Sequence, residues 1–390
     1  MPPTDGPPGF ASPRELFARL IAFASVSREP SAPIVEYVAG LLERAGCRVH
    51  RFPYDHGRKV NLLAVRGPKT EGGLLISGHL DVVPADEPEW RADPFVLREA
   101  DGHFVGRGAV DMKGFVALAI AALIRASDAE LRCPLAMLLT ADEEVGSRGA
   151  QAFLRDWDGR DALPRSVLVG EPTNQRVVRM HKGHLRMRLV ATGRSAHSGY
   201  PHLGDNAIER AARAIATLSQ FAQRLKSERA DTSAYFPECP HPALNIATIA
   251  GGRAANIVPD RCEILLGMRL LPGQDPAQWF ERTRTALDEL APQDRAAVAL
   301  ELDNDSPPML CPETAPVCAA AMRLANQSET LGVSYSTDAG VLSRQGFECI
   351  LLGPGDMERA HKPEEALPID AWNAFRPLLD RLIGAMCGAT

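Results

Sequence analysis

Several features of membrane, secreted and disulfide-bonded proteins are missing from this 390-residue sequence. No window reaches about 18 apolar residues, the length that spans a bilayer. The first ten residues, MPPTDGPPGF, lack the basic start and apolar run of a signal peptide. The eight cysteines are scattered without a CxxC pair, which predicts reduced thiols in a cytoplasmic protein rather than disulfides or a zinc ribbon.

Motifs for phosphate binding and for serine nucleophiles are missing too. No GxGxxG follows the first predicted strand, and the sequence has neither a GxxxxGK[ST] loop nor a GxSxG elbow. These absences argue against a nucleotide-binding α/β domain and against a serine hydrolase. The net charge of −6 also disfavours nucleic acid or an anionic membrane as the main partner.

Length and composition predict a globular protein of two domains. A chain of 390 residues is too long for one ordinary core, and 45% hydrophobic with 24% charged residues is a typical globular balance. Residues 1–11 are rich in proline and glycine and are expected to be frayed. Ser12-Pro13 predicts the start of the first helix, and helical segments then alternate with short apolar strands. This pattern predicts an α/β domain of three layers around a mostly parallel sheet. A long loop is expected at 84–110 and a helix near 313–331.

The pattern changes after residue 182. Residues 184–192 alternate apolar and polar side chains, as a half-exposed strand does. A helix at about 206–226, strands at about 243–250 and 262–271, a helix at about 275–290 and a strand at about 296–303 are expected next. The order β-α-β-β-α-β predicts an inserted two-layer α+β domain at residues 183–303. Residues 1–182 and 304–390 would then form the α/β domain.

The stretch LLISGHLD, residues 74–81, organises the α/β domain. Its apolar start reads as a buried strand, and Ser77-Gly78 is a turn signal. His79 and Asp81 follow, where ligands bind in open α/β sheets, just past the carboxyl end of a strand. The imidazole could bind a metal while the carboxylate holds the other ring nitrogen. Taken alone, the pair could equally be a surface histidine and aspartate.

Further acids and a second histidine follow other predicted strands. Glu143 and Glu144 come after the apolar run 134–140, and Glu171 comes after the run 166–169. Asp111 precedes an apolar helix, where it could also be a plain N-cap, and His361 follows a strand and a glycine-rich turn. In a mostly parallel sheet these strand ends share one edge.

Such a gathering of carboxylates would repel itself without a counter-charge. A divalent metal supplies that charge, and nitrogen and oxygen ligands without thiolates favour Zn²⁺, Mn²⁺ or Co²⁺. His361 completes a site for two metal ions, with a surface histidine as the alternative interpretation. The sequence therefore predicts a metal centre at this edge of the sheet.

Six stretches together resemble the dinuclear-zinc metallopeptidase family that includes acetylornithine deacetylase, succinyl-diaminopimelate desuccinylase, carboxypeptidase G and aminoacylases. They are SGHLDVVP, GRGAVDMKGF, TADEEVGSRGA, VGEPT, GRSAHSGYP and GPGDMERAHKPEE. They span residues 77–365 in family order. WRADPF, HKG, STDAG and GPGD…AHKPEE look most like the acetylornithine deacetylases.

The resemblance implies a role for each matching residue. His79 and Glu171 would hold one Zn²⁺, Glu144 and His361 the other, with Asp111 bridging both, Asp81 orienting His79 and Glu143 as general base. His197 would stabilise the oxyanion in the partner subunit of a homodimer formed by the inserted domain, and Gly199-Tyr200, less usual after SAHS, could alter its loop. Asn256 and Arg269 match positions that contact substrate, Arg269 as a carboxylate anchor or as a structural arginine of the strand surface. Asp338 is the acid expected to hold a substrate ammonium.

The implied activity is metal-dependent hydrolysis of an N-acyl amino acid, with N-acetyl-L-ornithine, a step of arginine biosynthesis, as the leading substrate. A desuccinylase, an aminoacylase, and a dipeptidase or carboxypeptidase of the same family remain alternatives. A binding protein that has lost catalysis is disfavoured, because every expected ligand type and Glu143 are present.

Overall fold

The computed structural model describes residues 12–159 and 163–388, so the fraying expected for residues 1–11 lies outside the described part. The chain forms two compact units. Unit 1 contains the residues up to Arg179, Leu310–Leu331 and the residues from Thr337 onward. Unit 2 contains Met180–Met309 and Gly332–Ser336. The inserted domain expected at residues 183–303, between the two parts 1–182 and 304–390 of the α/β domain, stays a prediction.

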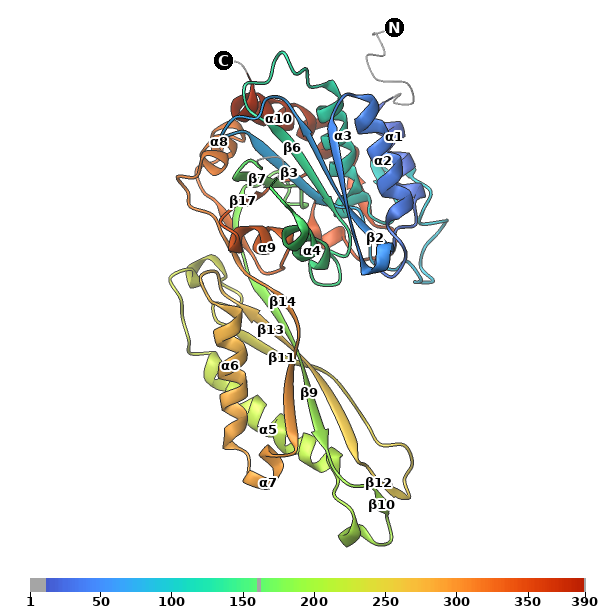
Figure 1. Ribbon diagram of the computed structural model, residues 1–390, viewed down its shortest axis with the longest axis vertical. Coiled ribbons are helices and arrows are strands. Elements are labelled where there is room, and N and C mark those ends of the chain that lie inside the picture. Colours follow the sequence, from blue (N-terminus) through green and yellow to red (C-terminus); the bar gives the residue numbers. More distant parts are fainter. Residues whose placement is uncertain (1–11, 160–162, 389–390) are drawn as a thin grey trace. The chain divides into compact units, whose positions relative to one another are not determined.

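A mixed sheet is the centre of unit 1 (Figure 1), and three of its strands, β8, β15 and β16, include residues that belong to unit 2. Its strand order is β1-β2-β6-β3-β7-β17-β8-β15, with β16 paired to β8. The strands are β1 (Arg48–Tyr54), β2 (Lys59–Arg66), β3 (Leu74–His79), β6 (Leu135–Thr140), β7 (Ser166–Val169), β8 (Val178–His181), β15 (Met309–Leu310), β16 (Leu331–Val333) and β17 (Glu348–Leu351). β6, β3, β7 and β17 run parallel, whereas β1–β2, β2–β6 and β17–β8 are antiparallel. The parallel strands expected from the sequence therefore form the middle of this mixed sheet.

Helices cover this sheet in layers. The helices are α1 (Pro13–Ala22), α2 (Ala32–Arg44), α3 (Gly114–Arg125), α4 (Arg148–Asp156), α8 (Pro316–Leu324), α9 (Asp338–Arg344) and α10 (Ile369–Cys387). Leu74 and Ile76 of β3 belong to one large apolar cluster with side chains of α1, α2, α3, α8 and α10. Leu75 is equally buried but lies outside that cluster, because successive strand residues face opposite sides. Burial on both faces explains the continuous apolar runs in the sequence.

Local signals fix most boundaries in unit 1. The Ser12 side chain accepts a hydrogen bond from the Glu15 backbone N–H, and Pro13 opens α1, as the sequence predicts. Two expectations were wrong in detail. The loop expected at 84–110 contains a hairpin of β4 (Arg98–Ala100) and β5 (His103–Val105), which pairs with β18 (Ala366–Pro368). The helix expected at 313–331 is the shorter α8, and α9 has too few residues to show a period.

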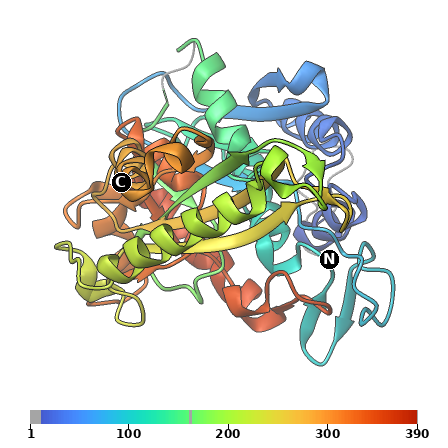
Figure 2. The same ribbon diagram turned by 90° about the horizontal axis from the view of Figure 1, so that it is seen from below.

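Unit 2 is a four-stranded antiparallel sheet with helices packed on one face. The strand order is β11-β13-β9-β14, and Figure 2 shows α5 lying along the strands. The elements are β9 (Gly183–Thr192), α5 (Ala207–Leu225), β11 (Ala243–Gly251), β13 (Arg261–Leu270), α6 (Pro276–Ala286), α7 (Pro292–Arg295) and β14 (Val298–Ser306). A separate ribbon pairs β10 (Ala196–His197) with β12 (Ile257–Val258). Buried and less buried residues alternate along β13, as expected for a sheet with one face on a core.

Candidate metal centre

The parallel strands bring the predicted ligands to one edge of the unit 1 sheet. His79 ends β3, and the segment with Glu143 and Glu144 follows β6 directly. Glu171 comes two residues after β7. Because β6, β3 and β7 are parallel neighbours, these side chains leave the sheet at the same edge. Asp111 reaches that edge from the turn before α3.

Two groups of ligand atoms form there and share Asp111. His79, Asp111 and Glu171 offer atoms within 4.8 Å of one another, as do Asp111, Glu144 and His361. His79 Nε2 lies 3.0 Å from Asp111 Oδ1, and His361 Nε2 lies 3.2 Å from Asp111 Oδ2. His361 Nε2 also lies 3.0 Å from Glu144 Oε1. Each Asp111 oxygen thus faces a different imidazole, an arrangement that suits a bridging carboxylate.

The electrostatics of the cluster show a need for positive charge. Burial and neighbouring carboxylates raise the pKa of Glu143 and of Glu171 well above the usual range. Hydrogen bonds to Asp111 and Glu144 raise the pKa of His361 to about 10. Burial works against the Asp111 carboxylate, but hydrogen bonds with His361 and His79 lower its pKa. Glu171 and His361 therefore retain protons that divalent cations would replace, so the donor set fits a metal centre.

Asp81 lies beside His79 but not in the expected way. The acceptor near His79 Nδ1 is the Asp81 backbone carbonyl, at 2.9 Å, whereas the nearest carboxylate oxygen is 3.7 Å away. That carboxylate instead accepts hydrogen bonds from the Ser27 hydroxyl and from the backbone N–H of Glu143. Asp81 thus orients His79 with its backbone and the Glu143 segment with its side chain.

The sequence reasoning missed a buried ion pair behind Glu143. Lys59 Nζ lies 2.6 Å from Asp142 Oδ1, and the Tyr54 hydroxyl donates to the other oxygen at 3.0 Å. Asp142 has a φ of 59°, a left-handed conformation that is strained for a non-glycine residue. These contacts hold the turn that presents Glu143. A lysine in the apolar strand KVNLLAVR was the signal that could have revealed it.

Two of the three predicted substrate residues of unit 2 lie close to each other. His197 and Asn256 lie on the β10–β12 ribbon and its loop, where Ser198 N–H donates to the Asn256 carbonyl at 3.0 Å. The His197 ring is exposed, and its Nδ1 accepts from Gly199 N–H at 3.0 Å. Arg269 is half-buried on β13, and burial lowers its pKa. No acidic side chain pairs with Arg269 among the described residues of unit 2.

Asp338 opens α9 in unit 1, where its side chain is enclosed. Only 2% of the residue is exposed, and one carboxylate oxygen accepts from the Thr140 hydroxyl at 2.6 Å. Burial raises its pKa to about 6. Its role as the acid that holds a substrate ammonium stays a prediction, and this enclosure weighs against it.

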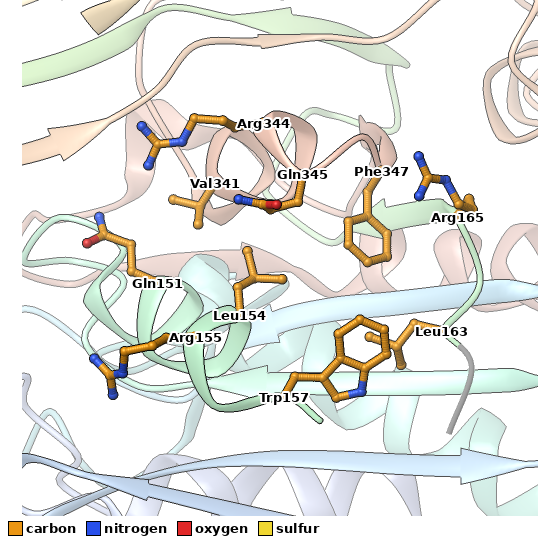
Figure 3. Close-up of a pocket in the computed structure, with 10 residues that line it drawn as sticks. All are labelled: Gln151, Leu154, Arg155, Trp157, Leu163, Arg165, Val341, Arg344, Gln345 and Phe347. Carbon is orange, nitrogen blue, oxygen red and sulfur yellow. The ribbon is translucent and has the colours of Figure 1, made fainter. Parts of the chain in front are cut away.

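A cavity of about 560 Å³ lies elsewhere in unit 1, between α4 and the end of α9 (Figure 3). None of the described residues that line it is a predicted metal ligand. Its arginines already have partners, since Arg155 pairs with Asp156 and Arg165 lies over the Phe347 ring. The chemistry of the cluster is therefore not built around this cavity.

In the described parts of the chain, no helix is long and apolar enough to cross a membrane.

Comparison with known proteins places these features in a family. Residues 75–383 match the family described as peptidase family M20/M25/M40. An acetylornithine deacetylase from Pasteurella multocida is 35% identical over 96% of this chain and 97% of its own length. An acetylornithine deacetylase from Edwardsiella ictaluri is 37% identical over 95% of this chain and 97% of its own.

Solved structures share the fold. An M20 family metallo-carboxypeptidase from Sulfolobus solfataricus superposes with a TM-score of 0.76 at 20% identity, over 95% of this chain and 98% of that one. A dinuclear metal-binding M20 peptidase from Bacillus subtilis gives a TM-score of 0.66 at 14% identity, over 95% and 96% of the two chains. The chain therefore belongs to peptidase family M20/M25/M40, a family of metal-dependent hydrolases.

Proposed function

We propose that the protein hydrolyses N-acetyl-L-ornithine to L-ornithine and acetate. Two observations support this substrate. The relatives that match nearly the whole chain at 34–37% identity bear the name acetylornithine deacetylase. In addition, unit 2 contains a desolvated guanidinium, Arg269, that lacks an acidic partner among the described residues and is suited to an α-carboxylate.

We further propose that the centre holds two Zn²⁺ ions per chain, with Co²⁺ or Mn²⁺ as alternatives. The donors are imidazole nitrogens and carboxylate oxygens without a thiolate, a set that suits these ions. His79 and Glu171 would hold one ion, Glu144 and His361 the other, and Asp111 both. When bound, such a pair lowers the pKa of water towards about 7 and polarises the acyl carbonyl.

Glu143 is the proposed general base. It lies beside the two ligand groups but belongs to neither, so its carboxylate is left for proton transfer. The Glu143 carboxylate would take a proton from the attacking water and then pass it to the departing amine, and burial, which raises its pKa, helps it to hold the proton between the two steps. The backbone bond from Glu143 N–H to Asp81 fixes the segment that carries it.

The residues of unit 2 would bind substrate and form a homodimer. Arg269 anchors the carboxylate, Asn256 contacts substrate, and His197 serves the active site of the second subunit by donating to the oxyanion. Nδ1 of His197 accepts from Gly199, which leaves Nε2 to carry the proton it would donate. Large exposed apolar side chains support a contact surface here, since seven of the nine in the described chain belong to unit 2. They are Tyr200, Leu203, Ile208, Tyr235, Ile249, Ile257 and Leu302.

The single observation that carries the activity is the pair of ligand groups joined by Asp111, with Glu143 beside them. The test is to load the protein with Zn²⁺, measure metal per chain, and compare kcat/KM for N-acetyl-ornithine, N-succinyl-diaminopimelate, N-acetyl-methionine and a dipeptide. We expect two ions per chain and at least a tenfold preference for acetyl-ornithine. A preference for the succinyl compound, acetyl-methionine or the dipeptide would replace the deacetylase with the corresponding alternative. Light scattering of the same sample tests the dimer.

A further inference from the structure

One fully buried carboxylate, Glu365, accepts four hydrogen bonds around the turn that carries Asp111. Its Oε1 accepts from the backbone N–H groups of Val110 and Asp111, at 3.0 and 3.1 Å. Its Oε2 accepts from Gly108 N–H at 3.0 Å and from the Arg107 guanidinium at 2.9 Å. The Glu365 backbone carbonyl also accepts from Gly106 N–H at 3.0 Å. Both carboxylate oxygens are thus fully used.

Arg107 extends this contact to the rest of unit 1. It is one of the largest fully buried side chains of the described protein. Besides Glu365, it donates to Glu87 at 3.0 Å and to the carbonyl oxygens of Pro84 and Lys362. A charged guanidinium that is buried needs such complete pairing. The turn is therefore tied to both the 84–87 loop and the segment after His361.

Glu365 lies four residues after His361, and it bonds the backbone of Asp111. Asp111 and His361 meet in the second ligand group although 250 residues separate them in the chain. The strands of the sheet do not align them, because Asp111 is in a turn and His361 is in a loop where its own φ is 59°. A purely structural role for Glu365 would stabilise the fold equally with and without metal.

We infer that Glu365 is a positioning residue for the metal pair, holding the Asp111 turn in register with the loop of His361. This inference rests on the proposed metal centre but not on the proposed substrate. Partners of this kind, which hold metal ligands without touching the ion, typically contribute about 10–100-fold to metal affinity. Glu365 belongs to the stretch AHKPEE, but the sequence alone does not distinguish its role from that of the neighbouring Glu364.

The test is Glu365→Gln in the full-length protein. An amide has the same shape, but its NH₂ group cannot accept, so two of the four donors lose their acceptor in either orientation. We expect the apparent affinity for Zn²⁺, measured by competition with a chelating indicator, to fall about 10–100-fold. The rise in melting temperature on adding Zn²⁺ should shrink as well, whereas a merely structural residue would lower the melting temperatures with and without Zn²⁺ equally.

Glu364→Gln is the matched control. Its carboxylate bonds the exposed Arg91 backbone and Arg98, so its loss should leave Zn²⁺ affinity within about twofold. Wild-type affinity in Glu365→Gln, or an equal loss in both variants, overturns the inference. If Glu365→Gln does not fold, Glu365→Asp replaces it, since the shorter side chain cannot reach all four donors. Unchanged affinity in that variant also overturns the inference, and a wild type that binds no Zn²⁺ overturns the metal centre itself.

Discussion

The predicted functional residues of unit 1 and unit 2 are held in different ways. In unit 1, His79 and Asp111 are buried, and their positions follow from strand ends, backbone hydrogen bonds and each other. In unit 2, His197 is exposed on a two-stranded ribbon, and its ring is oriented by the Gly199 N–H and by contact with the Tyr200 ring. Arg269 is half-buried and has no acidic partner among the described residues.

This difference matches what each unit would bind. A small cation needs donors fixed within a few tenths of an ångström, so its ligands belong on rigid elements with supporting contacts. A substrate is larger and has its own flexibility, so exposed side chains can adjust to it. Under the proposed function, this comparison separates metal binding, which the residues of unit 1 would carry, from substrate positioning, to which unit 2 would contribute.

The largest change in activity is expected at Glu143, where turnover should be lost while metal binding is retained. Glu143→Gln should lower kcat by about 10²–10⁴, because the amide cannot accept the proton of water. Metal content should stay at the wild-type value, since Glu143 belongs to neither ligand group. Glu144→Gln is the paired variant, and it should lose metal as well as activity. The two are distinguished by metal analysis after dialysis together with turnover. Near-normal turnover of Glu143→Gln with both metals bound would contradict its role.

Most of the fold of unit 1 could be predicted because its signals are local. Continuous apolar runs mark strands buried on both faces, and Ser12-Pro13 marks the start of α1. The antiparallel edges could not be predicted, since pairing direction depends on which strands become neighbours. The short α9 and the β4–β5 hairpin escaped detection because three to seven residues are too few for a period to appear.

The site was predictable where chemistry is tied to strand ends. His79, Glu143, Glu144 and Glu171 each follow an apolar run, so the sequence alone indicated their meeting. The supporting contacts were not predictable. Lys59 pairs with Asp142 across 83 residues, and Glu365 reaches Asp111 across 254. Nothing in a single sequence records such distant partners, and the Asp81 carboxylate was assigned to the wrong hydrogen bond for the same reason.

Removing the metal tests the comparison through the local stability of the two units. A ligand at about 1,000 times its Kd stabilises the native state by about 4 kcal/mol, close to 10³ in an exchange rate governed by unfolding. We expect Zn²⁺ loading to slow amide hydrogen exchange by up to that factor in β3, β6 and β7 of unit 1. Exchange in β9, β11 and β13 of unit 2 should change little. Mass spectrometry of peptides from loaded and chelator-treated protein measures both, and equal protection of the two units would contradict the separation.

A substitution of His197 tests the proposed contribution of unit 2 to the reaction. His197→Ala should lower kcat by about 10²–10³, the usual loss for one oxyanion donor, with unchanged Zn²⁺ content and affinity. His202→Ala is the matched control, because His202 is an exposed histidine of the same region whose ring lies against the Tyr200 ring. Its kcat should stay within about twofold of wild type. Loss of metal in His197→Ala, or an equal loss of activity in His202→Ala, would remove His197 from the chemistry.

The smallest effect is expected at Gly199, the residue that orients His197. A Cβ added there would lie 3.1 Å from His197 Nδ1, so the imidazole must shift by a few tenths of an ångström. The Gly199 N–H that bonds Nδ1 would remain. Because catalytic groups tolerate small displacements poorly, Gly199→Ala should lower kcat by about three- to tenfold without affecting Zn²⁺ binding. Gly384→Ala, where an added Cβ meets nothing within 4 Å, serves as the control and should retain full activity. In a His197→Ala background the Gly199 substitution should have no further effect, because the ring it displaces is gone. An additive loss in the double variant would show that Gly199 acts on something other than His197.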